Sequence, residues 1–356
     1  MSIKTLEGTR RTRPTIRALQ HITHPTGRAP ANLSHAPNRI PIERNVRMSR
    51  DSTVKLVIIV VELALVAALM VSRGLTVAVG DLGKPVGFAL LLLVVALFYQ
   101  KRKVSSFVMC LLGLTHVVVF TAGYTLLMYS VSTLNAPLVD QQLMNFDKAC
   151  GVSLPAIVEW AKANPGITGW LQLTYDSLLI QTALVVTVLG MRGKRVPMEQ
   201  FVMQFILSTL IVLLALTFAP ALGPFHAYGY ELNGAQERYM EHFTALRDGS
   251  MTRLTLSEAE GLITFPSFHT TWAIILAWAY RRDLLLFVPL SLVNLAVIFS
   301  TLTTGWHYFA DVVGGVLVAV VVIWLTNALK PWFYDENEEP RMVGSRNAAG
   351  PDVPQT

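Results

Sequence analysis

The chain has 356 residues, of which 53% are hydrophobic and 15% charged, and its mean hydropathy is +0.48. This composition excludes an ordinary soluble domain and predicts an integral membrane protein. The net charge is +6, and the two cysteines are too few for a disulfide framework.

The N-terminal segment, residues 1–53, is strongly basic, with Lys4 and nine arginines against three acidic residues. It is also rich in proline, asparagine, serine and threonine, which predicts a disordered tail beside anionic lipid headgroups. A nucleic-acid-binding arm is the alternative, but no folded nucleic-acid-binding domain follows it, so we expect no nucleic-acid partner. The tail is too long for the n-region of a cleaved signal peptide, so we expect the first apolar run to remain as an anchor.

A membrane-spanning helix needs about 20 apolar residues. Runs that approach this length predict an all-α polytopic bundle of about eight spans, at residues 54–72, 85–99, 104–131, 169–190, 201–222, 266–280, 284–304 and 307–329. The polar residues 331–356 that follow predict a disordered C-terminal tail. Residues 137–165 contain two short amphipathic segments that we expect to lie in the membrane interface.

Basic residues follow every second span, at residues 101–103, 192–195, 281–282 and 330. Cytoplasmic loops collect lysine and arginine, so this pattern predicts a multi-pass inner-membrane protein with both termini in the cytoplasm. The connections at residues 132–168 and 223–265 and the short turn at Gly305 then face outward, toward the periplasm. The sixth and eighth spans both begin on that outer face.

Each of these two spans begins with a histidine-containing motif, FPSFHTTWA at residues 265–273 and GWHYFADVVGG at residues 305–315. On a helix, His307 and Asp311 would lie one turn apart on the same face. The carboxylate could then accept the Nδ1 proton of His307 and leave Nε2 as a nucleophile or base. Gly314 and Gly315 would permit close helix packing.

The motif around His269 predicts an anion site. Pro266 suits the first position of a helix, and Ser267 and Thr270 would lie at its first turn, where backbone amides and the helix dipole attract phosphate. A second helix end at Gly305 could converge on the same phosphate. One histidine could then attack phosphorus while the other protonates the leaving oxygen, a scheme that requires neither a metal nor another cofactor.

The stretches PSFHT and GWHYFAD resemble the second and third signature motifs, P-S-x-H and S-R-x5-H-x3-D, of the type 2 phosphatidic acid phosphatase superfamily. The resemblance implies a catalytic six-helix membrane core at residues 104–330, with residues 54–103 as an added transmembrane hairpin. It also implies that His307 is the phosphorus nucleophile, that Asp311 orients it, and that His269 is the acid for the leaving group.

Two family features are missing, and both would supply cations that bind phosphate. Ser300 and Thr301 stand where the family has Ser-Arg, and the outer loop has no K-x6-R-P motif. The form TGWHYFAD is similar instead to the inositolphosphotransferase branch, which includes inositol phosphorylceramide synthase. Other cations must then neutralise the phosphate, and the candidates in the outer loop are Arg238, Arg247 and Arg253.

The expected function is a lipid phosphatase or phosphotransferase that acts on a phospholipid or lipid phosphate at the outer leaflet through a phosphohistidine. Whether water or an alcohol accepts the phosphoryl group is open, as is whether Asp176 is a structural partner or borders the site. The alternatives are a b-type cytochrome with His269 and His307 as haem ligands, and a proton-coupled transporter using Glu62, His116 and Asp176. Both fit less well, because the strongest polar signals lie at the rim of the bundle.

Overall fold

The computed structural model describes residues 50–334, which form fourteen α-helices, one 3₁₀ turn and two short strands. The predicted basic tail lies outside the described residues except at its end, because helix α1 (Arg50–Arg73) begins four residues earlier than the first predicted span. The predicted C-terminal tail also begins too early, since residues 331–333 belong to helix α14 (Lys330–Phe333). The remainder of both tails lies outside the described residues.

Six helices are long and apolar enough to cross a membrane: α1, α2 (Val79–Lys101), α3 (Ser105–Ser132), α8 (Arg195–Phe218), α12 (Leu284–Thr303) and α13 (Phe309–Ala328). The fourth predicted span is two helices, α6 (Pro165–Asp176) and α7 (Leu178–Met191), which meet at a 44° bend. The sixth is the 12-residue helix α11 (Phe268–Ala279), which at about 18 Å is shorter than the hydrocarbon core. All eight apolar runs are therefore helical, but only six of them, or seven with the bent pair, are full-length candidate spans.

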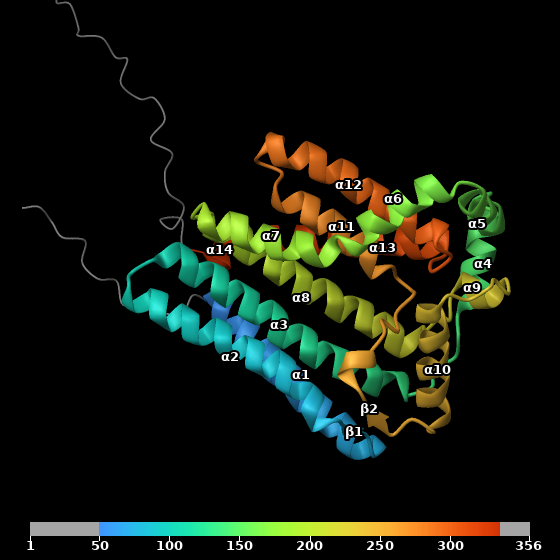
Figure 1. The fold of residues 1–356 in the computed structure, drawn as a ribbon, viewed down its shortest axis with the longest axis horizontal. Helices are drawn as coiled ribbons and strands as arrows, with labels where there is room; N and C mark the ends of the chain where they lie inside the picture. The colour runs from blue at the N-terminus through green and yellow to red at the C-terminus, as the bar shows by residue number, and fades with distance from the viewer. Residues whose placement is uncertain (1–49, 335–356) are drawn as a thin grey trace, which may run out of the picture. The chain divides into compact units, whose positions relative to one another are not determined.

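Helix α8 is the central helix of the bundle (Figure 1) and packs against α3, α7, α11 and α13. Its most apolar window is 61% buried, whereas those of α1 and α2 are 22% and 17% buried. The outer helices instead expose many large apolar side chains, such as Val71 and Leu285. An apolar surface of this extent is suited to lipid and not to water.

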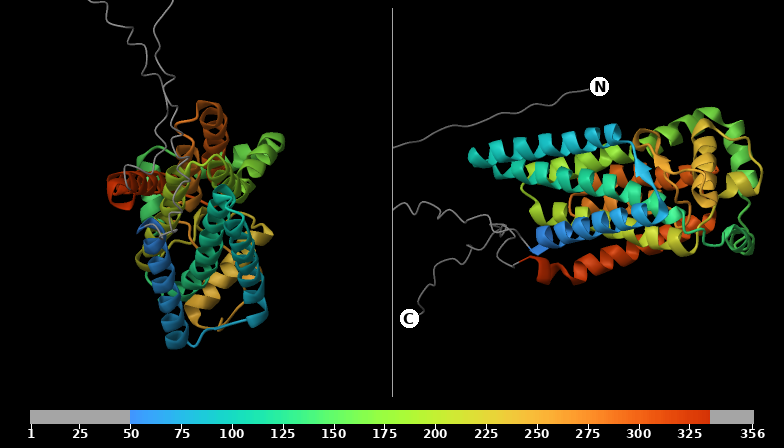
Figure 2. Two further views of the ribbon diagram at one scale, coloured as in Figure 1. Left: turned by 90° about the vertical axis from the view of Figure 1, so that its left-hand side faces the viewer. Right: turned by 90° about the horizontal axis from the view of Figure 1, so that it is seen from below.

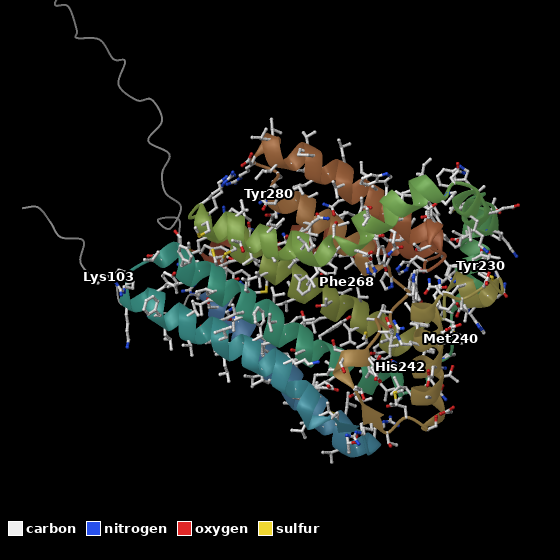
Figure 3. All side chains as sticks on the ribbon, in the orientation of Figure 1. Lys103, Tyr230, Met240, His242, Phe268 and Tyr280 are labelled. Carbon is white, nitrogen blue, oxygen red and sulfur yellow. The ribbon has the colours of Figure 1, made fainter. Side chains whose placement is uncertain are left out.

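The basic connections gather at one end of the bundle, as their spacing predicts. Arg192 pairs with Asp283, which joins the turn after α7 to the turn before α12, and Arg50 at the start of α1 donates to the Trp332 carbonyl of α14. Lys103, between α2 and α3, lies at this end and Tyr230 at the opposite end (Figure 3). The described chain therefore begins and finishes at the same end of the bundle.

The opposite end carries a folded cap of short elements (Figure 2). It comprises α4 (Asp140–Ala149), α5 (Leu154–Ala163), α9 (Pro224–Ala227), α10 (Gly234–Asp248), a 3₁₀ turn (Leu256–Glu258), and strands β1 (Thr76–Val77) and β2 (Arg253–Leu254), which pair in parallel. Both segments expected to be amphipathic are helices, α4 and α5. Tyr239, Phe243 and Leu246 of α10 are at most 1% exposed and pack with the ends of α3 and α8, so the long outer loop has its own apolar core.

Candidate active site

Two histidines meet where α11 and α13 begin, at the end of the bundle that carries the cap. His269 is the second residue of α11, and His307 lies in the turn that precedes α13. Their ring centroids are 5.9 Å apart, with the ring planes inclined at 59°. Two imidazoles separated by 38 residues of sequence can therefore act on one bound group.

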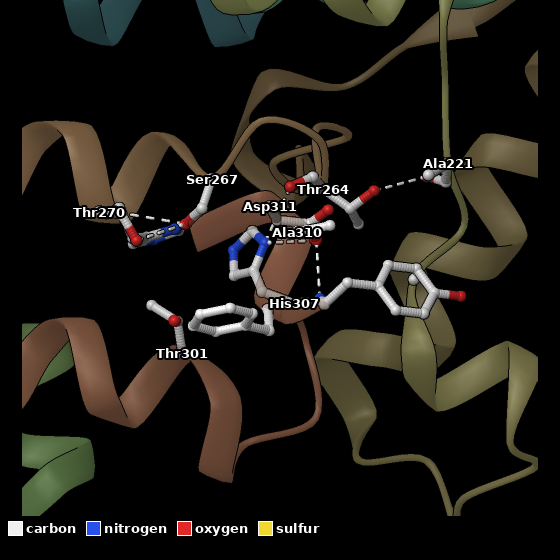
Figure 4. A network of polar contacts seen from close by, with 12 residues as sticks. Ala221, Thr264, Ser267, Thr270, Thr301, His307, Ala310 and Asp311 are labelled. Carbon is white, nitrogen blue, oxygen red and sulfur yellow. Dashed lines mark hydrogen bonds and ion pairs between the residues drawn. The ribbon is translucent and has the colours of Figure 1, made fainter. Parts of the chain in front are cut away.

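The backbone fixes the tautomer of His307, whose side chain is almost fully buried. Its Nδ1 lies 2.8 Å from the carbonyl oxygen of Thr264 and 3.3 Å from Oδ2 of Asp311. A carbonyl oxygen can only accept, so Nδ1 must carry a proton, and in the neutral imidazole Nε2 then has the lone pair. In Figure 4 this second nitrogen lies on the ring edge that faces Ser267 and Thr270 at the start of α11.

The geometry at Asp311 differs from the predicted one in two ways. His307 is not on the helix, because α13 begins at Phe309 and Asp311 is its third residue. The nearer partner of His307 is the Thr264 carbonyl, and Asp311 Oδ2 also accepts from the Tyr308 amide at 2.8 Å. Asp311 is therefore both the third-residue partner in the capping box of its own helix, whose N-cap is Tyr308, and a second acceptor for His307.

The start of α11 also differs from the prediction. Ser267 is the N-cap, so Pro266 precedes the helix instead of occupying its first position. Ser267 Oγ accepts from the amide and the hydroxyl of Thr270, and both residues are fully buried. Ser267 and Thr270 thus stabilise the helix end. The first-turn amides of Phe268 and His269 have no acceptor within their own helix, so they can donate hydrogen bonds to an anion.

Helices α11 and α13 are held together at their first turns. The Ser267 amide donates to the Asp311 carbonyl at 2.9 Å, and the Thr271 hydroxyl donates to the Gly315 carbonyl at 2.9 Å. A Cβ on Gly315 would overlap the Ser267 carbonyl oxygen, and one on Gly314 would lie 2.9 Å from Pro266 Cβ. The two glycines therefore permit the close approach that joins the histidines.

The N-terminus of α13 is not available to phosphate, contrary to the prediction of two converging helix ends. The amides of Phe309 and Ala310 donate to the carboxylate of Asp147 from α4, at 3.0 and 2.8 Å. Gly305 lies in a turn with a φ of +72°, where a Cβ would lie 3.2 Å from the Tyr230 ring. Of these two helix ends, that of α11 is left to hold an anion beside the histidines.

Tyr175 of α6 is a site residue that the sequence did not reveal. Its ring stacks on His269 with centroids 4.3 Å apart, and its hydroxyl lies 3.3 Å from His269 Nδ1. The neighbouring Asp176, predicted as either a structural partner or a site residue, is exposed and accepts from Gln172. Asp176 thus has a partner on its own helix, and Tyr175 is the α6 side chain that contacts a histidine.

Two of the three predicted phosphate-binding arginines have other partners, and the third is exposed. Arg238 pairs with Glu260 at 2.6 Å, and Arg247 donates to the Ala136 carbonyl and lies over the Phe243 ring. Burial lowers the pKa of the Arg247 guanidinium. Arg253 is exposed on β2, which pairs with β1. The structure brings none of these three side chains into contact with His269 or His307.

A cavity of about 460 Å³ adjoins the turn at Gly305 and has a basic residue in its lining. Val158 and Tyr230 line it and also surround Gly305, two residues before His307. Lys162 of α5 is the one basic residue in its lining, and burial raises the pKa of the Tyr230 hydroxyl to about 12. The remaining polar lining is neutral apart from Glu231: Thr168, Gln172, Asn233, Gln236, Thr303 and Thr304.

Two further observations bear on the chemistry of the site. Within residues 50–334, no three histidine, cysteine, aspartate or glutamate side chains are grouped so that they could hold a metal ion. Ser300 and Thr301, which occupy the Ser-Arg positions of the third family motif, are buried and donate to carbonyls of their own helix. Within the described residues, the histidine pair thus lies beside the end of α11 without a grouped metal-ligand set or the third-motif arginine.

The fold and the site define a membrane helix bundle with two histidines close together at one end. A family model described as the PAP2 superfamily, that is, the type 2 phosphatidic acid phosphatases, matches residues 141–325, just over half of the chain. The chain belongs to this superfamily, whose members are phosphatases and phosphotransferases. No curated protein and no solved structure matches the chain.

Proposed function

We propose that the chain is a lipid phosphatase or phosphotransferase that works through a phosphohistidine on His307, with a lipid phosphate or phospholipid as the phosphoryl donor. The observation that carries the proposal is that two acceptors, the Thr264 carbonyl and Asp311, face Nδ1 of His307, so that Nε2 of the neutral ring can act as the nucleophile. The ring of His307 lies 5.9 Å from that of His269, measured between centroids. Membership of the PAP2 superfamily supports the same reaction class.

In the proposed first step, Nε2 of His307 attacks phosphorus and the bond from phosphorus to the leaving oxygen breaks. His269 gives a proton to that oxygen. As the acid, His269 is an imidazolium with a proton on each nitrogen, so its Nδ1–H donates to the hydroxyl oxygen of Tyr175, 3.3 Å away, and Nε2 carries the transferable proton. The amides at the start of α11 would stabilise the charge that develops on the phosphoryl oxygens.

In the proposed second step, His269 takes a proton from the acceptor, whose oxygen attacks the phosphohistidine and regenerates His307. Water as the acceptor gives hydrolysis, and an alcohol gives phosphotransfer. The neutral amides and hydroxyls of the 460 Å³ cavity could hydrogen-bond a polyhydroxylated headgroup better than they could hold a second anion. This lining and the TGWHYFAD motif favour transfer, as in the inositolphosphotransferase branch.

The proposed orientation places the site at the outer leaflet of the inner membrane, with the basic turns in the cytoplasm. Cys150 allows a direct test, because it is exposed and directly follows α4 at the same end as the site, whereas Cys110 is buried. A membrane-impermeant maleimide should label Cys150 in spheroplasts, while Cys150→Ser should remain unlabelled. Labelling of the wild type only after the membrane is broken would reverse the orientation.

The activity is tested by incubating purified protein with phosphatidic acid, a prenyl diphosphate or phosphatidylinositol, each with and without inositol. We expect turnover of at least one donor, and we expect His307→Ala and His269→Ala to remove it while both variants still insert into the membrane. A phosphorylated inositol that forms from phosphatidic acid or the prenyl diphosphate only when inositol is added would indicate transfer. Release of inorganic phosphate from these two donors, or of inositol phosphate from phosphatidylinositol in water alone, would indicate hydrolysis. Full activity in His307→Ala would refute the proposal.

The structure gives the two rival functions little support. Glu62 faces Gly123, His116 bonds to a carbonyl of its own helix, and Asp176 accepts from Gln172. These three side chains have separate surroundings and form no continuous relay within the described residues, as a proton-coupled transporter would need. A cytochrome would show a Soret band on purification, and the family match supports phosphoryl chemistry instead.

A further inference from the structure

Helix α4 contacts both backbone segments that hold His307, through two carboxylates on one face. Asp140 and Asp147 are seven residues apart, which on a helix is two turns. Asp147 is 1% exposed and accepts the amides of Phe309 and Ala310. Asp140 accepts the amides of Leu222 and Gly223, at 3.0 and 2.9 Å. Four backbone amides from two distant segments therefore converge on one short helix.

Asp147 determines where α13 can begin. The first amides of a helix need acceptors, which a residue next to them in sequence usually supplies. Here the acceptor for two of them comes from more than 160 residues away, and its negative charge lies at the positive end of the α13 dipole. His307 is two residues before Phe309, so this contact fixes the turn that carries the nucleophile.

Asp140 supports the Thr264 carbonyl, the acceptor for Nδ1 of His307, through a chain of hydrogen bonds. The Tyr308 hydroxyl donates to Asp140 Oδ1 at 3.0 Å, which ties the residue after His307 to α4 a second time. Asp140 also holds Leu222 and Gly223, directly after Ala221. The Ala221 carbonyl accepts from the Thr264 hydroxyl at 2.8 Å, and the Thr264 carbonyl in turn accepts from Nδ1 of His307.

We propose that Asp140 and Asp147 are positioning residues for His307. Helix α4 sets the direction of the His307 Nε2 by holding the start of α13 and residues 221–223, which support Thr264. The role in turnover rests on the proposed function, whereas the role in fixing the ring does not. Neither carboxylate touches the reacting atoms. Both act through the backbone that carries His307 or its acceptor.

A merely structural role predicts different results from a positioning role. If the two carboxylates only stabilised the cap, their loss would lower the folded fraction and leave each folded molecule fully active. If they position His307, folded molecules should retain substrate binding but turn over more slowly, because a misplacement of about 1 Å at a reacting centre costs roughly 100-fold in rate. The ratio of kcat to KM effects separates the two roles.

The experiment compares Asp147→Ala, Asp147→Asn and Asp140→Asn with Glu159→Gln, a matched control that removes one negative charge from an exposed position on α5. Each full-length variant is purified in detergent, its thermal unfolding is measured, and kcat and KM are determined on the folded protein. The rate at which diethyl pyrocarbonate acylates His307 is then followed by peptide mass spectrometry. This rate reports on the ring without any substrate.

We expect Asp147→Ala to lower kcat by roughly tenfold or more with KM changed by no more than about twofold, and to change the acylation rate of His307. Asparagine keeps one carbonyl acceptor, so Asp147→Asn should lose less and remains informative if the alanine variant fails to fold. Glu159→Gln should match the wild type. Wild-type kcat and acylation in both Asp147 variants would overturn the proposal, as would activity that falls only in proportion to the folded fraction.

Failure of the proposed function gives a different result. If His307→Ala retains full activity, the reaction does not use this histidine, yet the acylation rates still test whether α4 positions the ring. If His307→Ala is inactive and the Asp147 variants behave as wild type in every measurement, the function stands and the positioning role is refuted.

Discussion

Gly315→Ala is the substitution whose effect on the site can be worked most directly from the structure. Gly315 lies in α13 against the first turn of α11, where its carbonyl accepts from Thr271. An added Cβ would overlap the Ser267 carbonyl oxygen and would lie 2.9 Å from Thr270 Cβ. Both of those atoms belong to the turn that carries His269, so the added methyl group must push the two helix starts apart.

The size of the effect follows from this distance. Carbon atoms pack best at about 3.5–4.0 Å, so α11 and α13 must separate by roughly 1 Å to accept the methyl group. A displacement of about 1 Å at a reacting centre costs on the order of 100-fold in rate, or about 2.7 kcal/mol of transition-state stabilisation. Overpacking of this kind also costs about 1–3 kcal/mol in folding free energy.

The assay is kcat and thermal unfolding of the purified variant on whichever lipid phosphate the wild type turns over. Gly87→Ala is the matched control, because Gly87 lies in helix α2 and an added Cβ there would meet nothing within 4 Å. It gains helix propensity of up to about 1 kcal/mol and should keep full activity. Full activity and unchanged stability in Gly315→Ala would refute the close packing of α11 on α13.

Three further predictions concern the surroundings of the histidine pair. Tyr175→Phe keeps the stacking on His269 but removes the hydroxyl contact, so kcat should fall several-fold, by about 0.5–1.5 kcal/mol, with unchanged thermal unfolding; wild-type kcat would remove Tyr175 from the site. Lys162→Ala should raise KM for the phosphorylated substrate by roughly tenfold, whereas Arg247→Ala should mainly lower thermal stability. A raised KM in Arg247→Ala with an unchanged KM in Lys162→Ala would assign the phosphate-binding role to Arg247. Treatment with a chelator such as EDTA should leave kcat unchanged, and restoration of lost activity by one divalent metal would contradict the metal-free scheme.

Hydropathy located all eight apolar helices, because lipid-facing runs of leucine and valine are long and bounded by charged turns. It did not give their true lengths. The bend between α6 and α7 falls inside one continuous apolar run, and α11 begins two residues into its run, so an apolar count reports neither. The two motifs begin the sixth and eighth runs, so the chain crosses the bundle twice between them. This count predicts that both motifs lie at the same end of the bundle, where the structure has both histidines.

The motifs predicted that His269, His307 and Asp311 lie together, as the structure has them, but not the groups that hold them. The nearest partner of His307 is a backbone carbonyl, that of Thr264, and any residue type can supply a carbonyl. Asp147 lies in a segment that reads as an interfacial helix, and nothing in its local sequence shows that it caps α13. Tyr175 is one aromatic residue among many in an apolar run, so its stacking on His269 leaves no sequence signal.

The arginines of the outer loop could not be ranked from the sequence because their positions depend on the apolar core under α10. Phe243 and Leu246 fold that loop against the bundle, and this packing directs Arg247 toward the Ala136 carbonyl. The charge of a loop can be read from sequence, but the direction of each side chain depends on its tertiary contacts.

The most direct test of the central claim is to trap the covalent intermediate. Purified protein is mixed with a turned-over lipid phosphate carrying a ³²P label, quenched in alkali within milliseconds to preserve a phosphoramidate, and digested for mass spectrometry. The account predicts a label on His307 that is acid-labile, absent in His307→Ala and longer-lived in His269→Ala. Turnover with no label on His307 at any quench time, or a label on another residue, would contradict it.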